Sequence, residues 1–246
     1  PRPGSLHICY CHTPMRYIWD QFDQYFCRVK SGLIPWTIMK MLRPWLQQWD
    51  SKTSCRVDDY IANSRHVQKR IKKYYLREAT IIHPPVDTKR FKPSGEKKKD
   101  YFLIVSAFAP YKRVDLAVEA FNKLGYPFVV VGEGQDADLL RRMASSNIRF
   151  DGWLDDMSIG DHYAGCRAFV FCGEEDFGIS LLEVQATGRP VIALGRGGAL
   201  ETVIPDKNTW KPETGIPENK TINPTGVFFY EQTSEDLIRA IQHFES

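Results

Sequence analysis

The most informative segment of the chain is residues 173–193, which read GEEDFGISLLEVQATGRPVIA. An apolar run at residues 168–172 precedes it, with the length and composition of a buried parallel strand. A second apolar run begins at Val191 and stops at the glycines of residues 195–198. Between the two runs we expect a helix that opens after a glycine-containing loop. The segment therefore predicts a strand–loop–helix–strand unit whose helix start faces the carboxyl edge of a sheet, where an anion can bind.

Two carboxylates bracket this loop and the first turns of the expected helix. Glu175 lies at the mouth of the loop and Glu183 lies inside the helix, with seven residues between them. Taken singly, each has a plain structural interpretation, because a glutamate near a helix start often acts as a cap and one in mid-helix usually faces solvent. Their combination with the surrounding pattern instead points to a ligand site.

The pattern continues beyond Glu183 as Ala-x-Gly-x-Pro-Val-Ile-Ala and then as Gly197-Gly198-x-x-Glu201. From Glu175 to Glu201 the chain resembles the donor-site signature of retaining glycosyltransferases of family 4, the glycosyl transferases group 1. The resemblance implies the GT-B architecture, an α/β fold of two Rossmann-like domains with parallel sheets. Only the latter part of the first domain would be present in this chain.

Composition is that of an ordinary globular protein. The 246 residues, 43% hydrophobic and 26% charged, suit one large or two modest domains. No apolar run has the length of a membrane span, and no secretory signal pattern opens the chain. Cys-x-x-Cys spacing is missing, so free thiols in a reducing cytoplasm are expected of the six cysteines: Cys9, Cys11, Cys27, Cys55, Cys166 and Cys172.

The domains are expected to divide near residues 92–99, which read KPSGEKKK and have the composition of a linker. We therefore predict an acceptor-side domain over residues 1–95 and a donor-binding domain over residues 96–246. Beyond the linker, apolar runs alternate with amphipathic segments at a spacing typical of a doubly wound parallel sheet.

Basic residues greatly outnumber acidic ones between residues 65 and 99. An anionic membrane surface, a nucleic acid or simply solvent could face such a patch. Aromatic side chains suited to stacking on bases are missing from it, so nucleic acid is the weakest of these alternatives and no nucleic-acid partner is expected.

A second candidate for membrane contact is the aromatic segment around Trp45 and Trp49, which stand one helical turn apart beside Met41. Core packing is the commoner fate of such a stripe, and Pro44 is expected to interrupt any single long helix. If the alternative holds, the protein would lie peripherally at the inner face of a membrane.

His12 is the candidate catalytic residue of the first domain. It follows an apolar run that ends at Cys11, and the carboxyl end of a strand is where open α/β sheets place their sites. The segment His-Thr-Pro-Met-Arg-Tyr-x-Trp also resembles the one that closes the acceptor side of the cleft in many family members. That resemblance implies a catalytic role for His12.

Lys112 is the candidate cation of the donor site. Family members carry Gly-Arg and, a few residues later, a lysine, and both cations hold the diphosphate of the donor. Lys112 matches the lysine, whereas Ala107 stands where the arginine would be. Either Arg113 substitutes for it, or backbone amides near Gly178 and Ile179 bind more of the anion.

The resemblance also implies the other roles at the donor site. Glu175 would act in catalysis by contacting hydroxyls of the donor sugar, and Glu183 would hold the ribose. Sugar and phosphate would meet backbone groups of Phe177, Gly178, Ile179 and Leu181. The nucleotide would lie near Gly132, and the base beside Gly152 and Trp153.

The implied reaction moves a hexose from a nucleotide-sugar to an acceptor hydroxyl, with retention at the anomeric carbon. A UDP-sugar is the favoured donor and GDP-mannose the next, with a sugar or a lipid-linked acceptor in polysaccharide or glycolipid synthesis. The protein would supply the positive charge, so no metal or other cofactor is expected. Two alternatives stay open: a GT-B enzyme of different chemistry, such as a phosphatase-like or sucrose-phosphate-handling relative, and a non-catalytic module that binds nucleotide-sugars.

Overall fold

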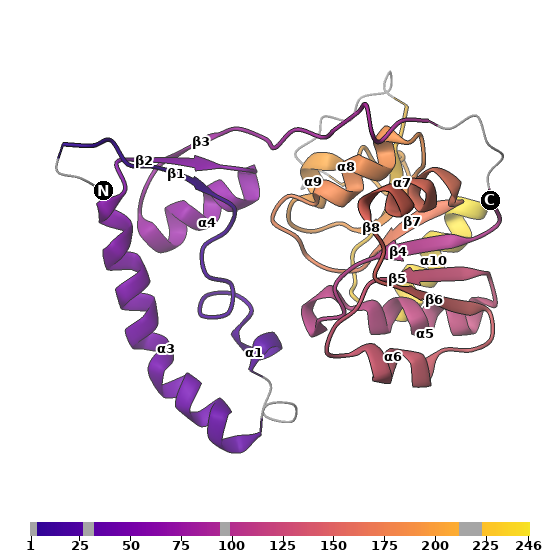
Figure 1. Cartoon of the computed structure of the whole chain (residues 1–246), viewed down its shortest axis with the longest axis horizontal. Coiled ribbons are helices and arrows are strands. Elements are labelled where there is room, and N and C mark those ends of the chain that lie inside the picture. Colours follow the sequence, from indigo (N-terminus) through magenta and orange to yellow (C-terminus); the bar gives the residue numbers. More distant parts are fainter. Residues whose placement is uncertain (1–3, 27–31, 94–98, 212–222) are drawn as a thin grey trace. The chain divides into compact units, whose positions relative to one another are not determined.

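The computed structural model describes residues 4–26, 32–93, 99–211 and 223–246 and divides into two compact units, Pro1–Pro84 and Pro85–Ser246 (Figure 1). The division lies before the boundary expected after residue 95. Its reason is packing, because Phe91 is buried in the core of the second unit and Val86 packs against that core. Most of the expected linker, residues 94–98, lies outside the described residues.

The second unit is built on one parallel sheet of six strands (Figure 1). In spatial order the strands are β6 (Ile148–Gly152), β5 (Phe128–Val131), β4 (Phe102–Val105), β7 (Ala168–Phe171), β8 (Val191–Leu194) and β9 (Gly226–Phe229).

Alternate side chains of these strands enter two separate cores. Phe102 and Ile104 of β4 belong to one apolar cluster, whereas Leu103 between them belongs to the other. This is the period of two that a pleated strand imposes on its side chains. Both faces of the sheet are therefore buried, which explains why the strands read as continuous apolar runs.

Helices cover both faces of the sheet (Figure 1). The cluster that contains Phe102 is closed by α5 (Val114–Leu124), α6 (Ala137–Met143) and α10 (Ser234–Glu245). The cluster that contains Leu103 is closed by α7 (Asp156–Gly165), α8 (Ile179–Ala186) and α9 (Ala199–Thr202). The expected doubly wound arrangement is confirmed, with β9 and α9 as elements that the sequence analysis did not predict.

The first unit has a smaller parallel sheet in the order β1 (Ile8–Cys11), β2 (Asp59–Ala62), β3 (Ala79–Ile81). Its helical elements are α1 (Phe22–Tyr25), α3 (Leu33–Thr53), η1 (Ser54–Arg56) and α4 (Arg65–Tyr75). Ser64 caps the start of α4, because its hydroxyl oxygen accepts a hydrogen bond from the Val67 N–H at 3.0 Å.

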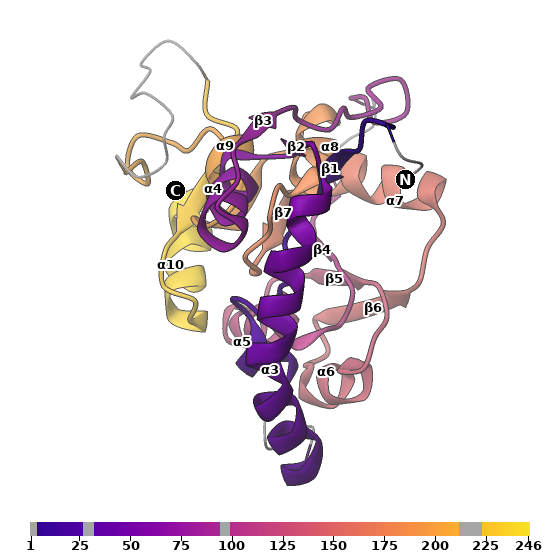
Figure 2. The ribbon, with the colours of Figure 1, turned by 90° about the vertical axis from the view of Figure 1, so that its left-hand side faces the viewer.

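The expected interruption at Pro44 is wrong, because α3 runs as one helix from Leu33 to Thr53 with Pro44 inside it. Side-chain contacts on both sides of the proline hold the helix to the unit. The Arg43 Nε and the Gln47 Nε2 both donate to the Ile18 carbonyl oxygen, at 2.8 and 2.7 Å. Figures 1 and 2 show α3 extending past the three-stranded sheet.

The described cysteines carry free thiols, as expected, and Cys27 lies outside the described residues. Within the described part of the chain, every helix is too short or too polar to cross a membrane.

Candidate functional site

The loops that follow β4 and β7 start side by side at the carboxyl edge of the six-stranded sheet. β4 pairs with β7, although the chain first passes outward through β5 and β6 before it returns. The order of the strands therefore reverses between β4 and β7. Open α/β sheets bind their ligands at such a reversal, outside the carboxyl ends of the strands.

Lys112 and Glu175 meet at this reversal. Lys112 ends η2 (Pro110–Lys112) in the loop after β4, and its Nζ pairs with Glu175 Oε1 from the loop after β7. Both side chains are largely shielded, with 20% of Lys112 and 18% of Glu175 exposed. The two predicted catalytic residues of this unit are thus brought together, as an ammonium and a carboxylate at one point of the sheet edge.

Close backbone packing holds Glu175 in place. The Gly198 N–H, in the loop after β8, donates to the Glu175 carbonyl oxygen at 2.7 Å, and Gly197 forms a parallel bridge with Glu175. A Cβ atom on Gly198 would lie 2.3 Å from the Phe177 Cα. Only glycine permits this approach, so the Gly-Gly pair of the sequence pattern serves to join the loops after β7 and β8.

Gly178 forms the start of α8, with a left-handed φ of 81° that glycine adopts without a steric penalty. Phe177 before it is buried, whereas Ile179 after it is partly exposed. The Leu181 side chain is fully buried in the core, and the Leu181 N–H donates to the Gly178 carbonyl oxygen at 3.0 Å. The first turn of α8 thus places its N-terminus directly behind the loop that carries Glu175.

Glu183 has partners on a different element. It is half-buried on α8 beside the Tyr163 hydroxyl of α7, and the Arg90 guanidinium contributes to its electrostatic environment. Burial raises the pKa of Glu183, while Arg90 and the hydrogen bond with Tyr163 oppose that rise. Arg90 itself pairs with Asp156 at 3.0 Å. Neither Tyr163 nor Arg90 was among the predicted site residues, because nothing in the sequence marks their proximity to Glu183.

Arg113, the predicted substitute for the missing arginine, follows Lys112 directly. It is one of two non-glycine residues of the described chain with a left-handed φ, at 53°. Its Nε donates to Asp115 Oδ1 at 3.1 Å, in the first turn of α5. Ala107, the residue that stands at the family's arginine position, lies earlier in the same loop, and its carbonyl oxygen accepts from the Ala109 N–H.

The residues predicted to lie near the nucleotide and its base are at the ends of β5 and β6: Gly132 follows β5, Gly152 ends β6 and Trp153 follows it. A Cβ on Gly132 would stand 1.9 Å from the Ser106 carbonyl oxygen, so glycine lets the loops after β4 and β5 touch. Gly152 has a left-handed φ of 68° and faces the Glu133 carboxylate. Trp153 beside it is 72% exposed, which leaves a large aromatic surface at this edge.

His12 belongs to the first unit, where it follows β1 and makes an edge-on contact with the Tyr10 ring. The Asn63 Nδ2 donates to the His12 carbonyl oxygen at 3.2 Å, and His83 Nδ1 lies 3.0 Å from the Asn63 carbonyl oxygen. The ends of all three strands of this sheet thus gather polar groups at one edge. Sequence reasoning missed His83, although its place after the run at residues 79–82 was a usable signal.

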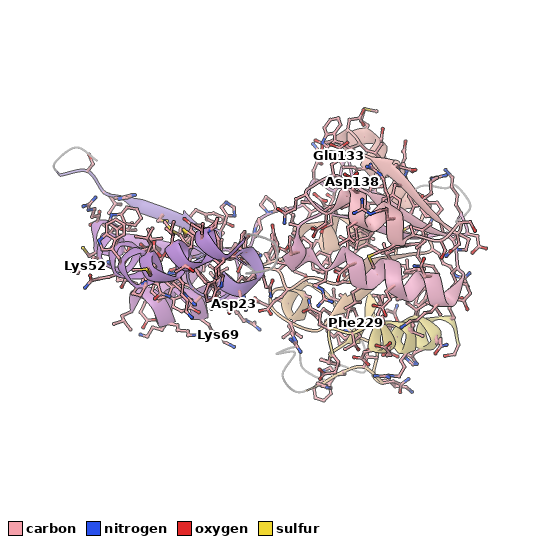
Figure 3. The ribbon with its side chains drawn as sticks, turned by 90° about the horizontal axis from the view of Figure 1, so that it is seen from below. Asp23, Lys52, Lys69, Glu133, Asp138 and Phe229 are labelled. Carbon is pink, nitrogen blue, oxygen red and sulfur yellow. The ribbon has the colours of Figure 1, made fainter. Side chains whose placement is uncertain are left out.

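An Asp-x-Asp sequence does occur at Asp136 and Asp138, but these residues begin α6 and are not clustered with further ligands. Figure 3 shows Asp138 on the outside of the second unit, where it pairs with Arg141. Across the described residues, no three His, Cys, Asp or Glu side chains are grouped as a metal site would require.

Comparison with known proteins places these features in a family. The family model for glycosyl transferases group 1 matches residues 85–246. O-antigen chain mannosyltransferase C of Escherichia coli is 30% identical over 186 residues, which cover 69% of this chain and 49% of that protein. A GDP-mannose-dependent monoacylated alpha-(1-6)-phosphatidylinositol monomannoside mannosyltransferase of Corynebacterium glutamicum is 31% identical over 193 residues, covering 66% of this chain and 51% of that protein.

Two solved structures share the fold. The crystal structure of Anabaena Alr3699/HepE in complex with UDP and glucose matches with a TM-score of 0.70 and 17% identity, over 97% of this chain and 61% of that one. Sucrose-phosphate synthase from Thermosynechococcus elongatus matches with a TM-score of 0.68 and 18% identity, over 98% of this chain and 58% of that one. These matches confirm the predicted α/β class with the parallel sheets of GT-B glycosyltransferases.

The chain spans about half the length of these two curated relatives. Within it, the family match covers the whole second unit, including the Lys112–Glu175 pair and the glycines that position it. The chain belongs to the family of glycosyl transferases group 1.

Proposed function

We propose that the chain acts in the retaining, metal-independent transfer of a hexose from a nucleoside-diphosphate sugar to an acceptor hydroxyl, as in family 4. The observation that carries this proposal is the meeting of Lys112 and Glu175 at the strand-order reversal, beside the N-terminus of α8. An ammonium and a helix start suit a diphosphate, and a carboxylate suits sugar hydroxyls.

GDP-mannose is the donor we propose, which reverses the order expected from the sequence. The names of the two curated relatives support it, because one is a mannosyltransferase and the other is GDP-mannose-dependent. The structure with UDP and glucose is only 17% identical and supports the fold alone. The second of these relatives acts on a phosphatidylinositol mannoside, which makes a lipid-linked acceptor a reasonable first choice for assay.

In the proposed step the acceptor oxygen bonds to the anomeric carbon on the face from which the diphosphate departs. The bond from that carbon to the diphosphate oxygen breaks, its electron pair stays on the diphosphate, and the acceptor proton moves to the same leaving oxygen. Negative charge therefore develops on phosphate, where the Lys112 ammonium and the partial positive charge of the α8 N-terminus would stabilise it.

The carboxylates have separate parts in this proposal. Glu175 would orient the sugar through its hydroxyls while Lys112 shifts toward the phosphate. Glu183 would hold the ribose, and its contacts with Tyr163 and Arg90 would set its orientation. His12, at the carboxyl end of β1, is the residue of the first unit for which we propose a catalytic role.

A second candidate function is binding of a nucleotide-sugar without catalysis. Ala107 favours it, because this position carries no cation, and Arg113 nearby already pairs with Asp115. A protein of this kind would bind donor but release no nucleoside diphosphate.

One experiment separates the two functions. The chain is titrated calorimetrically with GDP-mannose, GDP and UDP in the presence of EDTA, and nucleoside diphosphate release is then measured with a phosphatidylinositol mannoside acceptor. Binding with release supports the transferase, and binding without release supports the second candidate. Binding that vanishes with EDTA would refute metal independence. The same measurements are made on Lys112→Ala, and Lys89→Ala, which replaces an exposed lysine, serves as its control.

A further inference from the structure

A cavity of about 610 Å³ lies in the second unit beside β6, which Figure 1 shows at one edge of the six-stranded sheet. Its walls come from β6, from α7 and from the segment that precedes β4. That segment contributes Lys99 and Tyr101, which stand before the first residue of β4 and therefore at the amino edge of the sheet. Lys112 and Glu175 follow β4 and β7 and lie at the opposite, carboxyl edge. The cavity is thus separate from the candidate donor site, and its volume is that of a small-molecule site.

Arg149 and His162 form a network around Asp151 at this cavity. The Arg149 guanidinium donates to both carboxylate oxygens of Asp151, at 2.7 and 2.9 Å, and His162 Nε2 lies 3.0 Å from the same carboxylate. His162 Nδ1 lies 2.7 Å from the Ser158 carbonyl oxygen. An ionised carboxylate and a carbonyl can only accept, so both contacts are hydrogen bonds only when the ring carries both protons and is a cation. The network therefore holds two positive groups in fixed places.

Two cations at the cavity have hydrogen-bond donors left for a ligand. Arg149 contacts Asp151 through Nε and Nη2, which leaves its Nη1 without a partner among the described residues. Lys99 pairs with no carboxylate in the part of the chain that the structure describes. With His162, the cavity has more cations than carboxylates, which are Asp151 and Asp161. Its net charge is therefore positive, and a guanidinium beside an ammonium suits a phosphate group.

We propose that this cavity binds a small phosphate ester, with its phosphate between the Lys99 ammonium and the Arg149 guanidinium. Because Asp151 already holds the guanidinium, little side-chain entropy is lost when the ligand binds. The rest of the ligand would lie beside Ser158 and Asp161, whose hydroxyl and carboxylate oxygens accept hydrogen bonds from hydroxyl groups. The ligand class is therefore a phosphate monoester of a small polyhydroxylated molecule, such as a sugar phosphate.

This inference goes beyond the proposed function, and calorimetric titration with glucose 6-phosphate, inorganic phosphate and glucose tests it. Glucose 6-phosphate should bind more tightly than inorganic phosphate, and glucose should show no measurable binding. Lys99→Gln with Arg149→Gln should weaken glucose 6-phosphate binding about tenfold or more, because the charge-assisted contacts with the phosphate are lost. Lys207→Gln with Arg142→Gln removes the same two residue types at exposed positions outside the cavity, and this control should bind like the unmodified protein.

Asp161→Asn separates the charge of the cavity from its contacts with hydroxyl groups. Removing the negative charge should strengthen the binding of inorganic phosphate. An amide accepts a weaker hydrogen bond than a carboxylate, so the advantage of glucose 6-phosphate over inorganic phosphate should shrink. A variant that had lost its structure would bind both ligands more weakly, so a gain for inorganic phosphate excludes a folding effect.

Titrations with saturating GDP and with Lys112→Ala distinguish the cavity from the proposed donor site. Glucose 6-phosphate should bind equally well in both, because neither change touches the cavity. Displacement by GDP would place the phosphate ester in the donor site and overturn the proposal. Three further results would also overturn it: no binding below about 10 mM, equal affinity for inorganic phosphate and glucose 6-phosphate, or unchanged binding in Lys99→Gln with Arg149→Gln.

Discussion

Glu175 and Glu183 lie on one segment of chain, yet their surroundings differ in kind. Glu175, in the loop, meets a lysine that arrives from the neighbouring strand end. Glu183, on α8, is half-buried against a tyrosine of the preceding helix, α7, and burial raises the pKa of Glu183. The loop at a strand end thus pairs its carboxylate with a cation, whereas the helix provides a carboxylate held by packing. Two carboxylates in one sequence pattern need not share a task.

The largest effect is expected from removing Lys112, the cation that pairs with Glu175. Lys112→Ala should lower turnover about a hundredfold or more, because the charge that develops on the leaving diphosphate loses its nearest ammonium. Release of nucleoside diphosphate from the donor measures it. Lys89→Ala, which replaces an exposed lysine outside the carboxyl edge of the six-stranded sheet, should keep full turnover. A Lys112→Ala protein within a factor of about two of the unmodified one would remove Lys112 from the mechanism.

The two carboxylates should respond differently to the presence of the sugar. Glu183→Ala should weaken binding of GDP and GDP-mannose alike, by about tenfold or more, because a hydrogen bond to a charged group is worth about 1.5–3 kcal/mol. Glu175→Ala should weaken GDP-mannose binding and leave GDP nearly unchanged. Calorimetric titration of both ligands against both variants measures the pattern.

A purely structural role would give another pattern. Both variants would then lose thermal stability, with affinity changes that do not depend on whether the sugar is present. Melting temperatures recorded beside the titrations make the distinction. Equal losses for GDP and GDP-mannose in Glu175→Ala would show that its carboxylate does not contact the sugar.

Gly198, which packs against the loop that carries Glu175, can be tested separately. In Gly198→Ala the new methyl group would stand 2.3 Å from the Phe177 Cα, so the backbone has to move. We expect a loss of about 1–3 kcal/mol of unfolding free energy together with reduced donor binding, because Glu175 is carried on the same backbone. The measurements are urea unfolding and calorimetry. Gly160→Ala in α7, whose Cβ would meet its nearest atom at 4.0 Å, should leave both nearly unchanged.

The smallest expected effect is a dependence of folding stability on pH, caused by Glu183 on α8. Because burial raises the pKa of Glu183, the folded chain keeps a proton on this carboxyl at pH values where the unfolded chain has lost it. Stability should therefore fall as the pH rises from the ordinary glutamate value of 4.5 through the raised pKa. Glu183→Gln should lack this decrease, and Glu133→Gln, at an exposed site, should retain it. Urea unfolding over a pH series is the measurement, and parallel stability curves for the unmodified and Glu183→Gln proteins would contradict the expectation.

Much of the second unit could be predicted because its strands are short apolar runs with polar loops at their ends. Lys112 and Glu175 lie after such runs and were identified by their resemblance to the donor-site pattern of the family. Their contact could not be derived, since it depends on β4 pairing with β7 rather than with a strand adjacent in sequence. β9 was missed although Gly226–Phe229 is an apolar run, because no recognised motif follows it.

The contacts of Glu183 could not be predicted from the sequence, for a different reason. Tyr163 reads as one aromatic residue of an expected helix, and Arg90 as one cation of a basic stretch; only packing brings them to α8. Pro44 shows the reverse error. We expected proline to interrupt the helix and did not take into account the contacts that its neighbours make with the rest of the unit. Inward contacts of Arg43 and Gln47 keep α3 continuous despite the missing N–H of the proline.

The pairing of β4 with β7 also has a consequence for how the chain acquires its site. Lys112 and Glu175 are 63 residues apart, so the segment between them has to be closed into a loop before they can meet. Contacts of such long sequence separation are slow to form, because the entropy of loop closure opposes them. On the ribosome, Lys112 therefore stays without Glu175 until β7 has emerged and paired. If the proposed donor binds there, its binding would report that the sheet is complete and would shift the folding equilibrium by mass action.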